Sequence, residues 1–321
     1  MKQNSVAFLV LFSSLIIAPF TAFSAEARSD EANWENRQLQ GWNLKTGIQS
    51  RRVYVEIPGS GQLGTQAVKY YPEAEQSFFA ALEKNQVGFS ASLNTLFNKN
   101  SDKSYQDYRL YKYDEKWSSQ ASWMRYKGFK VNKSDIPNIR QTTAERSDIV
   151  LEGWNLGGMY NFFSDKVSLP AIFNGSARQK KSGGTVLGTG SLSQTSLKSD
   201  RGLIPYPQDS QECCTYKNDL NIYSASVGAL GIYNFVFLEN WLTGLGWGVE
   251  LGTQKVAQSL GPSSAFEAFA FNRYFLNFGY QGDKFYALIY FLENTHQVSP
   301  TQIEPITLGS TYSNFIVGYY F

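Results

Sequence analysis

The last nine residues of this 321-residue chain constrain its fold more than any other feature. Phe315, Val317, Tyr319 and Phe321 occupy every second position, so an extended strand carries all four on one face. Membrane β-barrels turn such apolar and aromatic faces toward lipid. We therefore expect an outer-membrane barrel that closes through this C-terminal strand. We also expect its aromatic pattern to be the signal that the barrel-assembly machinery binds.

The other end of the chain predicts export. Lys2 precedes an apolar run over residues 6–20, and small residues follow it, including Ala25 and Ala27. This is the layout of a cleavable secretory signal peptide, which we place at residues 1–25. Export to the outer membrane implies periplasmic chaperones as partners during biogenesis.

The composition agrees with a membrane barrel. Aromatic residues make up 16% of the chain, with 20 Tyr and 23 Phe, and barrels concentrate such side chains in girdles at both membrane interfaces. Beyond the signal peptide, no apolar stretch is long enough for a transmembrane helix. The formal net charge of +2 gives no indication of nucleic-acid binding. Outer-membrane lipids are the partner that this composition implies.

Alternating segments predict an all-β antiparallel barrel of about twelve strands over residues 63–321, with ten strands as the alternative. The predicted strands include residues 66–71, as the first, and residues 166–176. Residues 26–62 are charged and rich in amide side chains, and we expect a periplasmic lead-in or a plug segment there. One loop conflicts with the count, because residues 132–147 are long yet fall on the periplasmic side, where turns are short.

Charged residues within the predicted strands are candidates for the barrel lumen. An Arg that faces lipid at the bilayer midplane costs about 2–4 kcal/mol, and an acidic residue costs less. Five residues are predicted to face the lumen for this reason: Glu152, Glu250, Glu267, Arg273 and Glu293. They could line a water path or cross-link a packed interior through ion pairs.

Two segments, residues 123–129 and 169–185, carry a family resemblance. The residues concerned are Tyr126, Gly128, Phe129, Arg178, Gln179, Lys180, Lys181, Ser182 and Gly183. They resemble a bacterial outer-membrane family known as domain of unknown function 4421. The resemblance implies a fold and a location and assigns no catalytic residues. The basic residues could hold lipid phosphates or join an internal plug, but solvated residues at a turn are the simpler interpretation.

An enzymatic function has one weak candidate residue. A serine hydrolase needs a base beside its nucleophile, and His296 is the only histidine. Ser310 or Ser313 could approach it from the adjoining strand. The adjacent Cys213 and Cys214 are the only cysteines, and they could form a strained vicinal disulfide or simply lie in a loop. We expect no metal and no cofactor.

The leading hypothesis is therefore a non-enzymatic outer-membrane barrel that acts as a narrow channel or as a structural envelope protein. A lipid-modifying acyl hydrolase or transferase centred on His296 is the first alternative. A secreted soluble β-sandwich that binds a ligand is the second, and the aromatic content and terminal Phe321 disfavour it.

Overall fold

Antiparallel strands make up most of the structure, a computed structural model that describes residues 34–36, 41–57, 68–72, 76–94, 103–131, 145–200, 219–258, 266–298 and 306–321. The elements are β1 (Trp34–Asn36), β2 (Trp42–Ile57), β3 (Val68–Pro72), β4 (Gln76–Lys84), β5 (Val87–Leu93), β6 (Ser104–Tyr113), β7 (Trp117–Val131), β8 (Glu145–Asn161), α2 (Leu169–Phe173), β9 (Ala177–Gln179), β10 (Gly183–Lys198), β11 (Asp219–Phe237), β12 (Trp241–Gln258), β13 (Glu267–Gln281), β14 (Phe285–Val298) and β15 (Ile306–Tyr320). No helix among these residues is long and apolar enough to span a membrane.

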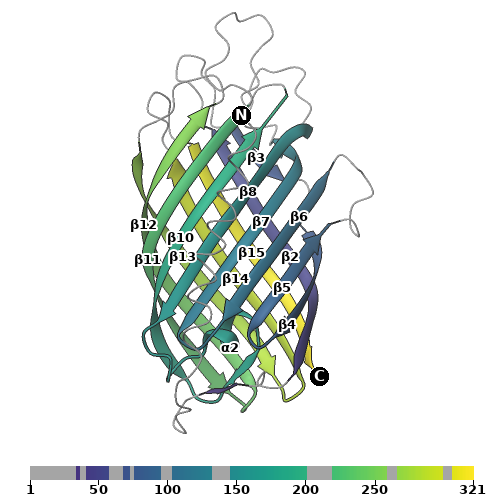
Figure 1. The fold of residues 1–321 in the computed structure, drawn as a ribbon, viewed down its shortest axis with the longest axis vertical. Helices are drawn as coiled ribbons and strands as arrows, with labels where there is room; N and C mark the ends of the chain where they lie inside the picture. The colour runs from purple at the N-terminus through teal and green to yellow at the C-terminus, as the bar shows by residue number, and fades with distance from the viewer. Residues whose placement is uncertain are drawn as a thin grey trace, which may run out of the picture. The chain divides into compact units, whose positions relative to one another are not determined.

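The sheet closes on itself, because the last strand pairs with β2 (Figure 1). The ladder between them runs from Thr307 opposite Glu56 to Tyr320 opposite Asn43. At its end the backbone of Trp42 donates to the Phe321 carbonyl at 2.9 Å and accepts from the Phe321 N–H at 3.0 Å. The predicted closure through the C-terminal strand is therefore confirmed, and a closed ring excludes the soluble β-sandwich.

Twelve strands form the ring, as predicted, and the wall narrows toward one end. The ring contains β2, β4, β5, β6, β7, β8 and β10 to β15. Beyond the ends of the short strands β5 and β6, β3 pairs with both β2 and β7, through Tyr70 opposite Val55 and Val131. Ten strands close the wall at that level, so the shorter hairpin β5–β6 is inserted only in the other half.

Two ends of the barrel can be distinguished, and we call them the base and the rim. The base holds Phe321 and the short turns at residues 85–86, 114–116, 238–240 and 282–284 (Figure 1). Apart from residues 162–182, which contain α2 and also lie at the base, the connections at the rim span more residues, from 299–305 up to 199–218. Short turns at one end and long loops at the other are typical of outer-membrane barrels, whose short turns lie in the periplasm.

The outer surface is apolar and the interior polar, the reverse of a soluble protein. Strand β4 alternates strictly between exposed and buried positions. Its exposed side chains include Phe78 and Leu82, whereas Ser77 and Glu83 are fully buried. Soluble proteins rarely expose this much apolar surface, because its contact with water is unfavourable. The outer face therefore fits a hydrocarbon environment.

The apolar belt has the height that a membrane requires. On β12, the side chains of Leu245, Trp247 and Leu251 each expose more than half of their surface. The apolar outer positions of this strand begin at Trp241 and end at Leu251, which matches the about 9–11 residues that a tilted membrane strand needs. At the base, Trp241 packs against Phe278 with ring centroids 5.3 Å apart, as in an interfacial aromatic girdle.

The predicted strand at residues 166–176 is wrong. This segment contains the short helix α2, for which Ser168 is the N-cap and accepts a hydrogen bond from the Ala171 N–H at 3.3 Å. Pro170 in the first turn also favours a helix start and opposes a strand ladder. With this strand removed from the count, the connection between the end of β7 at Val131 and the start of β8 at Glu145 belongs to the rim, which resolves the conflict over that loop.

The prediction of a periplasmic lead-in or plug over residues 26–62 is wrong for residues 42–57. Residues 42–57 form β2, which pairs with β4 on one side and β15 on the other. Its outward positions Leu44 and Ile48 are apolar, but Ser50 and Arg52 follow them, so the apolar pattern is short. Sequence analysis missed two ring strands, β2 and β4. It counted two segments that are not among the twelve, residues 166–176 and residues 66–71, which overlap β3, so the total of twelve was still correct.

A β-bulge at Gly128 explains the Tyr-x-Gly-Phe motif. Tyr126 and Phe129 are both fully buried, although residues three apart on a regular strand face opposite sides. The register of β7 shifts between Lys127 and Phe129, and Gly128 adopts a φ of 86°. A bulge with a left-handed glycine adds one residue and turns Phe129 to the lumen.

The bulge makes Gly128 sensitive to substitution. We expect Gly128→Ala to lower the free energy of unfolding by about 1–3 kcal/mol, because alanine is strained at positive φ. The control is Gly190→Ala in β10, where an added Cβ would meet only the Ser226 carbonyl oxygen, at 3.8 Å. Urea unfolding in detergent micelles measures both, and equal losses for the two variants would contradict this role of Gly128.

A proline in β2 tests whether this segment belongs to the wall. Thr46 lies opposite Ala80 on one neighbouring strand and Val317 on the other. Thr46→Pro should prevent folding to the heat-modifiable form on gels, because proline removes a ladder donor in a strand paired on both sides. Thr46→Val, which keeps a β-branched residue, should fold normally. Normal folding of both variants would show that barrel closure does not need this strand.

Candidate functional site in the barrel interior

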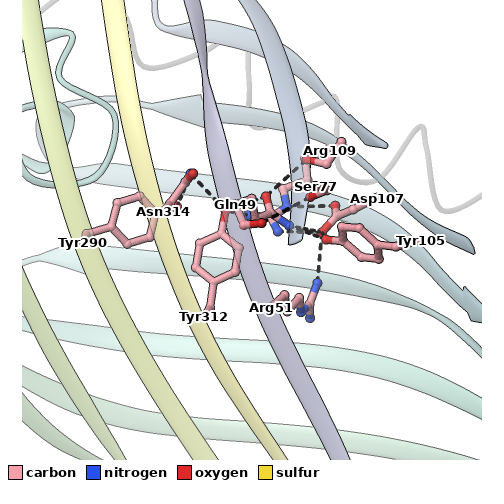
Figure 2. A network of polar contacts seen from close by, with 10 residues as sticks. Gln49, Arg51, Ser77, Tyr105, Asp107, Arg109, Tyr290, Tyr312 and Asn314 are labelled. Atoms are coloured by element: carbon pink, nitrogen blue, oxygen red, sulfur yellow. Dashed lines mark hydrogen bonds and ion pairs between the residues drawn. The ribbon is translucent and has the colours of Figure 1, made fainter. Parts of the chain in front are cut away.

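The largest polar network of the interior is centred on the carboxylate of Asp107 on β6 (Figure 2). Asp107 is only 1% exposed. Arg109 binds it with two nitrogens, Nε to Oδ1 at 2.9 Å and Nη2 to Oδ2 at 2.6 Å. The Nη1 of Arg51 on β2 and the hydroxyl of Tyr105 also donate to Oδ2, at 3.0 and 2.8 Å. Such charge-assisted, two-point contacts are among the strongest hydrogen bonds in proteins.

The network continues to the C-terminal strand (Figure 2). Arg109 Nη1 donates to the Tyr312 hydroxyl at 2.9 Å, and that hydroxyl donates to Oε1 of Gln49 at 2.9 Å. Asn314 Nδ2 donates to the same hydroxyl at 3.2 Å. Since β2, β4 and β5 separate β6 from β15 in the ring, these contacts link strands that are not neighbours in the wall.

A second network joins the wall to the segment that contains α2. Glu83 on β4 is fully buried and forms an ion pair with Lys45 on β2. Tyr111 donates to Glu83 Oε2 at 3.3 Å. Asn174, which follows α2, donates to both carboxylate oxygens of Glu83, at 3.3 and 3.2 Å. The carboxylate therefore neutralises a buried lysine and holds the α2 segment at the same time.

A third network lies on β10 to β13. Glu250 is 2% exposed and forms an ion pair with Arg273 Nη1 at 2.7 Å. The hydroxyls of Thr189 and Ser226 donate to its two oxygens, each at 2.8 Å. The structure thus places Glu250 and Arg273, two of the charges that the sequence assigned to the lumen, in contact with each other.

The α2 segment occupies the base of the barrel interior. Leu169 and Ile172 are fully buried and pack in a cluster with wall residues such as Leu187 and Phe275. Gln281 on β13 donates to the Ala171 carbonyl at 2.8 Å, which satisfies a backbone acceptor of the helix. Apolar packing and wall amides together fix this segment.

The basic motif after α2 supports the same segment. Gln179 is buried, and its amide donates to the Lys166 and Lys181 carbonyls at 2.7 and 3.0 Å and accepts from the Ser168 N–H at 3.1 Å. Arg178 donates to the Glu239 carbonyl at 3.3 Å and lies 3.5 Å from Asp283. The remaining polar members, which are exposed, are Lys180, Lys181 and Ser182.

Gly183, the last residue of the motif, allows a close approach of the chain to itself. A Cβ at this position would lie 2.7 Å from the Lys166 carbonyl oxygen, so only glycine fits without a shift. The Ser182 hydroxyl accepts from the Val236 N–H at 2.9 Å. The motif therefore shapes the base of the barrel, and its contacts are to the chain itself.

The rim half of the interior contains an apolar cluster, beside the buried Arg146–Asp148 ion pair. Its buried cluster contains Tyr126 and Phe129 of the Tyr-x-Gly-Phe motif. The other buried members are Val53, Val55, Tyr70, Tyr105, Ile149, Leu151, Leu197, Leu220, Ile222 and Val256. Residues from most of the ring meet here, so the interior between rim and central network is packed with side chains.

Two of the predicted lumen charges lie on the outer face instead. Glu152 shares a strand face with the exposed Trp154 and forms an ion pair with the half-exposed Lys198 at 2.7 Å. Glu293 shares a face with the exposed Ile289. Both side chains therefore point away from the lumen. Glu267 shares the inward face with Arg273.

Several predicted site residues lie outside the described residues. They are the side chain of His296 and the whole of Cys213, Cys214 and residues 1–25. Within the described ranges, no group of three His, Cys, Asp or Glu side chains is arranged to hold a metal ion.

The central network was not found by sequence analysis. Asp107 and Arg109 are two residues apart on β6, a spacing that places them on one face, and this was the available signal. Lys45 and Arg51 lay in the segment interpreted as a lead-in. No pattern in the sequence indicates that β2 and β6 bring their charges together.

These features define the class of protein: a closed antiparallel barrel with an apolar, aromatic-bordered outer belt and a polar interior is an outer-membrane β-barrel. The chain belongs to the family described as Domain of unknown function (DUF4421), which matches residues 23–321. This confirms the family resemblance. No curated protein sequence matches the chain.

Several solved structures resemble the chain at low sequence identity. The outer membrane protease OmpT from Escherichia coli has 8% sequence identity and a TM-score of 0.37, over 88% of this chain and 97% of that one. The toluene transporter TodX from P. putida has 9% identity and a TM-score of 0.27, over 88% and 90%. OprG from Pseudomonas aeruginosa has 10% identity and a TM-score of 0.26, over 91% and 99%. Scores this low carry no argument about activity.

Removing the central carboxylate should be strongly destabilising. Asp107→Ala leaves Arg51 and Arg109 without their counter-ion, and breaking a buried pair in this way costs about 3–5 kcal/mol. The control is Glu56→Ala, because the Glu56–Lys69 pair at 3.1 Å is one-third exposed and should contribute about 0–1 kcal/mol. Urea unfolding in micelles measures both, and a loss below 1 kcal/mol for Asp107→Ala would contradict the central role of this carboxylate.

Proposed function

We propose that the protein is a closed, non-enzymatic barrel with a structural role in the outer membrane, inserted with its C-terminus in the periplasm. The observation that carries the proposal is the α2 segment inside the base, which Asn174 and Gln281 anchor to the wall. A barrel that conducts solutes needs a continuous hydrated path through its lumen. The α2 segment occupies the base, where such a path would open to the periplasm.

The charges of the interior networks are largely paired. Arg51 and Arg109 share one carboxylate, and Glu250 has its own arginine at 2.7 Å. Glu250 and its arginine neutralise each other, and Asp107 offsets one of the two arginine charges beside it, so the central network keeps one net positive charge. Links across the ring also stiffen the wall, which suits a structural function.

A narrow channel is the second candidate, and one observation favours it. Strands β10 and β11 carry small inward-facing residues that are partly exposed, namely Ser191, Ser193 and Ser224. They bond in cross-strand pairs, with Ser193 and Ser224 oxygens 2.6 Å apart. Small side chains fill less of the lumen than the tyrosines and arginines near β6. A water path through the barrel would therefore run along β10 and β11.

The lipid-modifying enzyme stays a prediction that depends on His296 alone. Its test is acyl hydrolysis or transfer on phospholipid and lipopolysaccharide substrates by the native protein and by His296→Ala. Activity that the substitution abolishes would establish this alternative, and absence of activity in the native protein would remove it.

Conductance in planar lipid bilayers tests the closed barrel. We expect the refolded native protein to insert without single-channel steps, because the α2 segment fills the base. The double variant Asn174→Ala, Gln281→Ala removes two anchors of that segment and should give brief openings. The control is Gln106→Ala on the outer face of β6, which should stay silent. Regular steps from the native protein would contradict the proposal and support the channel.

A further inference from the structure

The outer wall near the rim is layered across four adjacent strands, β6, β7, β8 and β10. The register of these strands defines rows of residues that lie side by side. The lowest of these rows is aliphatic and contains Leu110, Ala121, Leu156 and Leu192. The next row contains Tyr108, Trp123, Trp154 and Gln194. Aliphatic residues below aromatic ones are typical of the boundary between hydrocarbon and head groups.

The aromatic row is ordered by its own contacts. Tyr108 stacks on Trp123 with ring centroids 5.8 Å apart and an interplanar angle of 23°. The indole N–H of Trp154 donates to Gln194 Oε1 at 2.8 Å. All of these side chains point outward. Because their contacts hold them in place, they form an ordered surface for the acyl chains and the glycerol or sugar region of a lipid.

Basic side chains lie directly above this row. Arg125 follows Trp123 on the same face of β7, and Lys127 is the next residue of that face. Lys198 on β10 lies level with Lys127, since both are in register with Val150 of the strand between them. We call Arg125, Lys127 and Lys198 the rim patch.

The charge of this region is positive after its acids are counted. The charged side chains here are the cations Lys103, Arg125, Lys127, Lys130 and Lys198 and the carboxylates Glu145, Glu152, Asp200 and Asp219, so five positive and four negative charges leave a net +1. Glu152 lies in the ladder directly opposite Arg125, but its 2.7 Å ion pair is with Lys198. Arg125 is exposed and has no ion pair with a described residue.

We propose that the rim patch binds the phosphate groups of a membrane lipid whose acyl chains lie against the aromatic and aliphatic rows below. The patch is at the level of the head groups, because it begins one residue pair above the aromatic row. A guanidinium such as that of Arg125 can donate two parallel hydrogen bonds to a phosphate, and lysines add attraction without fixed geometry. Trp123 and Leu156 supply apolar surface for the acyl chains. A soluble phosphate has no acyl chains and would leave this surface uncovered.

The proposed occupant is a lipid because the basic rim patch directly adjoins the apolar rows below it. A soluble anion would need only the cations, yet the cations stand on a continuous outward apolar wall. The proposal is independent of whether the barrel conducts.

Native mass spectrometry of the protein in dodecylmaltoside micelles tests the proposal with a defined lipid. The probe is lipid A with two phosphates, compared with the same lipid A after dephosphorylation and with inorganic phosphate. Each basic residue near a lipid head group contributes about fivefold in affinity. The triple variant Arg125→Gln, Lys127→Gln, Lys198→Gln should therefore bind the diphosphorylated lipid about a hundredfold more weakly.

A matched control removes three positive charges from the rest of the rim. This variant is Arg52→Gln, Lys69→Gln, Lys255→Gln, and it should keep the native affinity. Equal losses in both triple variants would mean attraction by net charge alone and would overturn the proposal. Equal binding of the dephosphorylated lipid, or binding of inorganic phosphate as tight as that of the lipid, would overturn it as well. Heat-modifiable migration on gels shows that each variant is folded.

A second variant works in the opposite direction and does not depend on loss of binding. Glu152→Gln removes the carboxylate that pairs with Lys198 and adds one net positive charge to the patch. It should tighten binding of diphosphorylated lipid A about fivefold and leave the dephosphorylated lipid unchanged. Unchanged or weaker binding of the phosphorylated lipid would contradict the proposed role of the patch.

Discussion

Backbone pairing between β2 and β15 is the constraint on which the rest of the structure depends. In hydrocarbon an unpaired backbone group has no water to bond, so a sheet in a membrane must have no open edge. The exchange of hydrogen bonds between Trp42 and Phe321 completes the ring at the very end of the chain. Once the ring is closed, each strand has one lipid-facing and one enclosed face, and every side chain must suit one of them.

The enclosed face creates the second problem, which is to fill a polar interior without leaving charges unpaired. Asp107, Glu83 and Glu250 solve it in three places, each by binding cations together with neutral donors. A buried charge that has lost its partner is costly, so these networks leave little freedom in how the strands align. The α2 segment uses one of them, through Asn174 and Glu83, to fix its own position in the base.

The sequence predicted the features that depend on neighbours along the chain. The alternation in β15 and the closing role of Phe321 follow from spacing within a few residues. The prediction failed where local signals were mixed. Strand β2 passes from apolar to charged outward positions at Ser50, and residues 166–176 alternate like a strand although Ser168 and Pro170 start a helix.

By itself, then, the sequence determined the class of fold and the inward or outward phase of most strands, because strand periodicity and turn chemistry are local properties. Only the tertiary structure decided that Arg51 and Arg109 meet at Asp107, that the Arg178–Gly183 motif shapes the base, and that Arg125, Lys127 and Lys198 share one outer patch. These groupings depend on which strands are neighbours and on their register. Both are set by closure of the whole ring, and no single segment of the chain encodes them.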